Sequence, residues 1–162
     1  MKRKAFTIVE LVVYMGILSI LLMVFIDMFA TLVNRQLETE SLSSVQQDAN
    51  YLLSRLNYDF SQSKNIQVPA TASSPSASLT LLNGSTPYYY FLKSDNLIAS
   101  HSGILDQLNS SETTISNVSF QRLGIGNARD VVQVKCDITS KSKKQSGYDV
   151  THFSTTLGIR EK

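Results

Sequence analysis

The sequence of 162 residues contains one cysteine and two histidines, and each shortage argues against a class of protein. One cysteine, Cys136, cannot form a disulfide within the chain, so a disulfide-held scaffold is excluded. Cys136 lies in a stretch of alternating apolar residues, where we expect a small buried side chain; a reactive thiol is the alternative. The two histidines, His101 and His152, are far apart and belong to no metal-binding motif.

An excess of charge of one sign is also missing. The chain has 15 Lys and Arg residues against 13 Asp and Glu residues, a formal net charge of +2. Three of the basic residues are Lys2, Arg3 and Lys4, so twelve basic residues face thirteen acidic ones in the remainder. Nucleic-acid binding usually needs a basic face, and we therefore predict no direct binding to nucleic acid.

Sequence patterns of enzymes are absent as well. The chain has no HExxH, CxxC, P-loop or GxSxG motif, and Gly124 and Gly126 lack the third glycine of a dinucleotide-binding loop. His101, Ser102 and Asp106 are close in sequence, but a catalytic triad depends on spatial arrangement and not on sequence spacing. We predict that the chain is not an enzyme and has no catalytic residue, cofactor or metal site.

One long apolar run lies near the start of the chain. Residues 6–26 are almost all apolar and would form a helix of about 31 Å, which matches the hydrocarbon thickness of a bilayer. The basic residues before the run should remain cytoplasmic, so the rest of the chain should emerge on the outer side. The run is too long for a cleaved secretory signal peptide, whereas an uncleaved signal anchor is an open alternative.

One acid, Glu10, lies inside this run. A carboxylate in a membrane segment costs about 2.5–3.5 kcal/mol on insertion scales, so Glu10 should have a partner. A cation near the head of the helix would compensate the charge, because an ion pair in low dielectric avoids leaving either charge alone. The alternative is that Glu10 reaches the nearby membrane interface and stays solvated there.

The start of the chain resembles the type IV pilin superfamily, which comprises pilins, minor pilins and the pseudopilins of secretion and DNA-uptake machines. The resemblance lies in the basic leader of residues 2–4, the small Ala5, the aromatic Phe6 and an acid, Glu10, five residues into the mature chain. The family usually has glycine before the cleavage site, where this chain has Ala5.

The resemblance implies that a prepilin peptidase cleaves between Ala5 and Phe6 and that the new amino terminus of Phe6 is methylated. It implies that Lys2, Arg3 and Lys4 supply the charge of the leader. It also implies that Glu10 pairs with the cationic terminus of a neighbouring subunit during assembly. The expected partners are the peptidase, other pilin or pseudopilin subunits, the inner-membrane assembly platform and, before assembly, the lipid bilayer.

The helix should continue beyond the membrane. No glycine or proline lies between Gly16 and Pro69, which permits one helix from residue 6 to about residue 63. Asp27 should mark the point where this helix leaves the lipid. Its second half has an apolar stripe at helical spacing, which predicts a face packed on a domain; the stripe comprises Leu42, Val45, Ala49, Leu52, Leu53, Leu56 and Phe60. Residues 51–63 and 153–160 resemble J-type minor pseudopilins of type II secretion and W-type minor pilins.

The remainder has the pattern of short strands. After a loop at 68–78, the alternation of apolar and polar residues predicts strands at 79–82, 88–93, 97–100, 118–122, 131–138 and 151–159. We expect a helical turn at 104–109, a lysine-rich loop at 140–147, and tyrosines 88–90 packed against their neighbours. The expected fold is α+β, with one antiparallel sheet on the second half of the helix.

The sequence therefore predicts four segments: a cleaved leader (1–5), a membrane or filament-core helix (6–27), its amphipathic continuation (28–64) and an outer β-sheet domain (65–162). The expected protein is a single-pass minor pilin or pseudopilin in the cytoplasmic membrane, with its N-terminus inside. It would serve a type IV pilus, a type II secretion system or a competence system. The alternative is a monomeric, signal-anchored protein whose β domain binds a partner.

Overall fold

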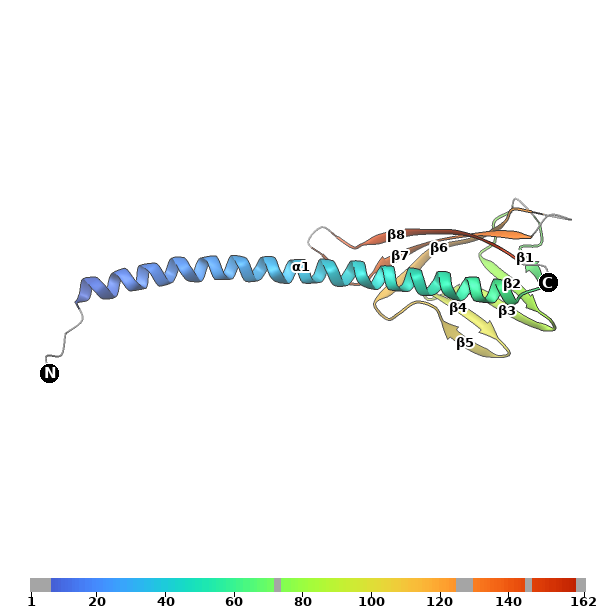
Figure 1. The fold of residues 1–162 in the computed structure, drawn as a ribbon, viewed down its shortest axis with the longest axis horizontal. Helices are drawn as coiled ribbons and strands as arrows, with labels where there is room; N and C mark the ends of the chain where they lie inside the picture. The colour runs from blue at the N-terminus through green and yellow to red at the C-terminus, as the bar shows by residue number, and fades with distance from the viewer. Residues whose placement is uncertain (1–6, 72–73, 125–129, 145–146, 160–162) are drawn as a thin grey trace.

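The computed structural model describes residues 7–71, 74–124, 130–144 and 147–159. It contains a single long helix, α1 (Ile8–Gln62), and a β domain that covers only the second half of that helix (Figure 1). At 1.5 Å per residue, the 55 residues of α1 extend about 82 Å. The prediction of one uninterrupted helix is confirmed over the described residues.

Local chemistry sets both ends of α1. At the start, the hydroxyl of Thr7 accepts a hydrogen bond from the backbone N–H of Glu10 at 3.3 Å, which satisfies one of the free donors of the first turn. At the end, Ser63 adopts an extended conformation, and its N–H and hydroxyl both donate to the carbonyl of Asp59. No glycine or proline interrupts the segment after Gly16, so the helix continues without a break.

The eight strands of the described residues form two antiparallel sheets. The first sheet is a meander in chain order, made of β1 (Asn65–Val68), β2 (Ser78–Asn83), β3 (Thr86–Lys93), β4 (Asn96–His101) and β5 (Ile104–Gln107). The second sheet has the order β6 (Thr113–Arg122), β7 (Val131–Ser140) and β8 (Val150–Gly158). α1 lies mainly against β7 and β8, and the sheets meet where β6 contacts β2, β3 and β4.

Two expectations about the sheet were wrong, and one strand was not predicted. The strands form two sheets where one was expected. The segment Ile104–Gln107 is a strand and not a helical turn, because Ser102 and Gly103 both have positive φ and form a tight hairpin that returns the chain along β4. β1 was not expected at all, since its four residues are too few to show a pattern. The α+β class is confirmed.

The domain core contains most of the predicted apolar stripe of α1. Val45, Leu52, Leu56 and Phe60 are almost completely buried, whereas Leu42 at the edge of the stripe is exposed. Cys136 is a free, buried cysteine on the inner face of the second sheet, as expected. Burial first and the negative charge of Asp137 second raise the pKa of its thiol to about 12, so it is not a thiolate at neutral pH.

The predicted packing of tyrosines 88–90 is correct for two of the three. Tyr90 is fully buried, and the ring of Tyr88 stacks on His101 with centroids 5.2 Å apart. Tyr89 points to the other face of the sheet and is 46% exposed.

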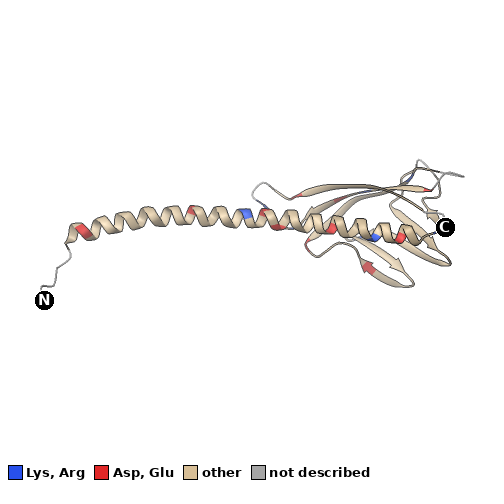
Figure 2. Ribbon diagram, viewed as in Figure 1, with Lys and Arg blue, Asp and Glu red and all other residues tan. Residues whose placement is uncertain are grey.

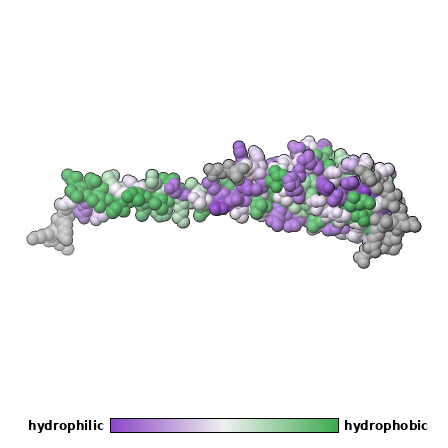
Figure 3. All heavy atoms as spheres, turned by 90° about the horizontal axis from the view of Figure 1, so that it is seen from above, coloured by the Kyte–Doolittle hydropathy of each residue, from purple (hydrophilic) through white to green (hydrophobic). Residues whose placement is uncertain are grey.

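The first half of α1 does not pack against the β domain. Every described residue from 7 to 40 is exposed, and Figure 3 shows a narrow rod with a largely hydrophobic surface projecting from the domain. This segment is long and apolar enough to cross a membrane. A folded domain and an uncovered apolar rod are thus joined by a single helix.

Candidate functional site

Glu10 lies in the first turn of the uncovered half of α1. Figure 2 shows how rare charge is along this half, where residues 8–34 include only two charged side chains, Glu10 and Asp27. The Glu10 carboxylate accepts a hydrogen bond from the hydroxyl of Tyr14, one turn further along, at 3.4 Å. The backbone N–H of the same residue is held by Thr7. The Thr7 bond caps the helix, whereas the Tyr14 bond is the one that reaches the carboxylate.

Other polar side chains in this part of the helix are already engaged. Between Glu10 and Asp27 the only polar side chains are those of Tyr14 and Ser19. The hydroxyl of Ser19 donates to the carbonyl of Met15 at 2.8 Å, within its own helix turn. Within the described residues, the bond from Tyr14 is therefore the side-chain hydrogen bond that the Glu10 carboxylate receives.

The other predicted site residues lie outside the described residues. These are the leader residues Lys2, Arg3 and Lys4 and the two residues of the expected cleavage site, Ala5 and Phe6. Of the predicted set, only Glu10 can therefore be placed, in the first turn of α1.

The surface around Glu10 is almost entirely apolar and exposed. Apolar side chains from Ile8 to Phe29 are mostly more than half exposed, which in water would expose a continuous hydrophobic surface. Lipid, or the helices of other molecules, can cover such a surface. The site is therefore suited to burial in an apolar environment and not to binding a small polar ligand.

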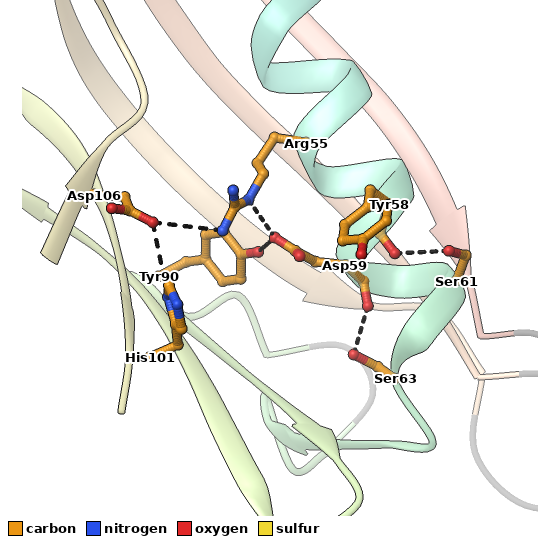
Figure 4. Close-up of polar contacts among 8 residues, drawn as sticks. All are labelled: Arg55, Tyr58, Asp59, Ser61, Ser63, Tyr90, His101 and Asp106. Atoms are coloured by element: carbon orange, nitrogen blue, oxygen red, sulfur yellow. Dashed lines mark hydrogen bonds and ion pairs between the residues drawn. The ribbon is translucent and has the colours of Figure 1, made fainter. Parts of the chain in front are cut away.

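A second polar cluster joins the end of α1 to the first sheet (Figure 4). The carboxylate of Asp59, only 4% exposed, accepts hydrogen bonds from Arg55 Nε at 2.9 Å and from the hydroxyl of Tyr90. A second guanidinium nitrogen of Arg55 lies 3.6 Å from Asp106, and His101 Nδ1 lies 3.7 Å from the same carboxylate. The pKa of Tyr90 is strongly raised, first by burial and then by its bond to Asp59, so the phenol stays a hydrogen-bond donor.

Two further acids hold the helix to the domain. The buried Asp48 accepts bonds from the N–H and the hydroxyl of Ser110, at 2.9 and 2.8 Å, and from the hydroxyl of Thr113. Asp149, just before β8, accepts a bond from Ser41 at 2.8 Å. Hydrogen bonds from Lys144 first and Ser41 second lower the pKa of Asp149. These contacts position α1 and do not resemble a reactive centre.

These acids were not predicted from the sequence, although their spacing contains a signal. Asp48 follows Val45 by three residues and precedes Leu52 by four, and Asp59 follows Leu56 by three. This spacing places both acids on the buried face of the helix, where a carboxylate must be hydrogen-bonded. Over the described residues, no group of three or more His, Cys, Asp or Glu side chains is arranged to hold a metal ion.

Comparisons of the chain with protein-family models, with curated proteins and with solved structures found no match.

Proposed function

We propose that this chain is a minor pilin or pseudopilin subunit that is processed by a prepilin peptidase and assembles through its N-terminal helix. The observation that carries the proposal is the exposed half of α1. It is an apolar segment of bilayer length with one acid in its first turn, continuous with a helix that supports a folded domain.

Physical chemistry links this arrangement to assembly. The exposed apolar segment needs lipid before assembly and needs neighbouring helices once it leaves the lipid. Since close-packed helices exclude water, the Glu10 carboxylate would then require a cation. The methylated amino terminus of Phe6 on a neighbouring subunit would carry the positive charge to supply it.

The remaining parts of the proposal come from the sequence. The basic residues 2–4 favour a cytoplasmic N-terminus in the cytoplasmic membrane, with the β domain outside. The J- and W-like segments favour a minor subunit that helps to start or cap the filament of a type IV pilus, a type II secretion system or a competence system. Its partners would be the peptidase, sibling subunits and the assembly platform in the membrane.

The mature N-terminus tests this proposal directly. Mass spectrometry of the chain from membranes of a host with prepilin peptidase should show a terminus at N-methylated Phe6. Recovery of only the intact Met1–Lys162 chain from such a host would contradict the proposal.

The role of Glu10 needs a separate experiment. Glu10→Ala should reduce the share of the chain in sheared filaments at least tenfold, while membrane insertion is retained or improved, because the costly acid is removed. Asp27→Ala, which removes the other acid of the exposed half, is the matched control and should assemble normally. Unchanged incorporation of the Glu10 variant would contradict the charge pair.

A monomeric anchored binding protein remains the second candidate, and one observation favours it. The outer face of the first sheet carries the apolar side chains of Tyr89, Phe91, Ile98 and Leu105 in two adjacent rows, and Tyr89 and Leu105 are exposed. An apolar sheet face of this kind is typical of protein contacts. An unprocessed chain that never enters filaments would favour this candidate.

A further inference from the structure

The hydrogen bond from Tyr14 to Glu10 gives the acid a partner within its own chain. Tyr14 lies four residues after Glu10, and its hydroxyl lies 3.4 Å from Glu10 Oε1. Side chains in a helix lean toward its N-terminus, so the phenol of residue 14 reaches back to the level of residue 10. The ring itself is apolar and suits a position near the membrane interface.

Among the described residues of the apolar segment, Tyr14 is also the only side chain placed to donate a hydrogen bond to the Glu10 carboxylate. The other hydroxyl in the apolar segment, that of Ser19, donates to the carbonyl of Met15 and is two turns and more from Glu10. The Thr7 hydroxyl is engaged with the backbone N–H of Glu10. Leucine, valine, isoleucine, methionine and phenylalanine make up nearly all of the remainder of this segment, and none of them can donate a hydrogen bond.

We propose that the hydroxyl of Tyr14 is the partner of the Glu10 carboxylate in the unassembled, membrane-inserted subunit, and that assembly replaces it by the cationic terminus of a neighbouring subunit. The second half of this statement rests on the proposed function; the first half does not. Tyr14 is then a positioning residue. It stabilises the acid in the membrane and so opposes assembly until a stronger, charged partner arrives.

Removal of the Tyr14 hydroxyl should favour assembly. Tyr14→Phe removes the donor, keeps the ring and raises the free energy of the inserted subunit, but not that of the filament. The ratio of filament to membrane-bound chain should therefore rise about five- to tenfold, the equivalent of one hydrogen bond of about 1 kcal/mol or slightly more. Tyr58→Phe, an exposed tyrosine on the domain half of α1, is the matched control and should leave the ratio unchanged.

A double-mutant cycle separates this role from simple packing. In the Glu10→Ala background, Tyr14→Phe should change the ratio less than twofold, because the acceptor has gone. An equal change in both backgrounds, no change in either, or a fall in the ratio would overturn the proposal.

The unassembled state can be tested without any filament. The full chain is reconstituted in lipid vesicles with fluorotyrosine at position 14, and its fluorine NMR signal is compared with and without Glu10→Ala. The signal should shift when the acid is removed, whereas a label at Tyr51 should not. An unshifted signal at position 14 would overturn the intramolecular bond. If the signal shifts but the chain never enters filaments, the bond stands and the proposed function fails.

Discussion

Three acidic side chains of the domain, Asp48, Asp59 and Asp149, each join α1 to a strand or loop that is distant in the sequence. Two of them are buried on the helix itself, where an unpaired carboxylate would be costly. Each accepts at least two hydrogen bonds, so the desolvation cost is offset and the bonds have directional character. At the scale of single residues, these acids determine how the helix is rotated against the sheets.

Asp48 should be the most sensitive of these positions. Asp48→Ala leaves the N–H of Ser110 and the hydroxyls of Ser110 and Thr113 without their acceptor, and we expect the free energy of unfolding to fall by about 3 kcal/mol or more. Urea unfolding of the full chain in detergent micelles, followed by circular dichroism, measures this. Glu40→Ala, an exposed acid on the same helix, should change it by less than about 0.5 kcal/mol. Similar losses for both variants would contradict the role of Asp48.

Low pH should lower the stability of the domain through Asp149 and Asp137. Both carboxyls have a pKa below the ordinary value of 3.8, Asp149 through Lys144 and Ser41, and Asp137 through Asn117 and His152. A depressed pKa adds stability that is present above the ordinary value and is lost as the pH falls below it through the folded-state value.

The unfolding midpoint of the domain should therefore not change through these groups between about pH 7 and pH 5, and should fall below about pH 4. Asp149→Asn should reduce this acid dependence. If the variant loses stability with the same slope below pH 4 as the parent chain, Asp149 does not contribute to it.

The helix α1 illustrates how one element can have two environments. Its second half places an apolar stripe and two acids on one face against the sheets, whereas its first half has no buried face. The loop from β5 to β6 contributes a buried polar side chain of its own. Asn109 donates to the carbonyl of Thr113 and accepts from the N–H of Leu97, and so spans the two sheets. Elements of this domain are joined by such polar links as well as by apolar packing.

Two leucines of α1 test the buried face of this element. Leu56→Ala removes a fully buried side chain and leaves a cavity between helix and sheet, which should cost about 2–5 kcal/mol of unfolding free energy. Leu42→Ala makes the same chemical change at a position that is 55% exposed, and should cost less than about 1 kcal/mol. Equal costs measured by urea unfolding would show that the stripe is not packed as described.

The whole molecule consists of a folded domain and an apolar rod that share a helix but few contacts. Residues 7–40 contribute nothing to the domain core, because all of them are exposed. Stability of the domain should therefore be independent of the length of the rod. If the proposed function holds, assembly should depend on that length, since a membrane-inserted rod would set the distance between membrane and domain.

Deleting residues 31–37 tests this independence. Seven residues are almost two helical turns, so the deletion shortens the rod by about 10 Å and nearly preserves its rotation. The unfolding midpoint of the domain should stay within about 2 °C of the parent, because the side-chain contacts that are lost are all exposed: the Arg35–Glu38 ion pair and the hydrogen bonds from Thr31 to Asp27 and from Thr39 to Arg35. The matched deletion of 45–51 removes buried Val45 and Asp48 and should abolish the cooperative transition. A large loss from the first deletion would contradict the independence.

Sequence alone was sufficient for the helix and for most strands. The spacing of Val45, Leu52 and Leu56 and the lack of glycine or proline are local properties, and a helix is made of local hydrogen bonds. The same holds for alternation in β7 and β8 and for the buried Cys136. Glu10 could be singled out from the sequence because one acid in an apolar run has a cost that does not depend on the fold.

Tertiary structure decided the rest. The division of the strands into two sheets, the strand at Ile104–Gln107 and the hydrogen-bond partners of Asp48 and Asp59 all depend on which distant segments meet. Backbone donors and carboxylates are satisfied by partners tens of residues away, such as Ser110 for Asp48 and Tyr90 for Asp59. No local pattern specifies these pairs. The sequence by itself determined a long helix, an apolar segment of membrane length and its single acid, because these follow from near neighbours; only the folded chain determined how that helix is held, because hydrogen-bond partners are chosen in space.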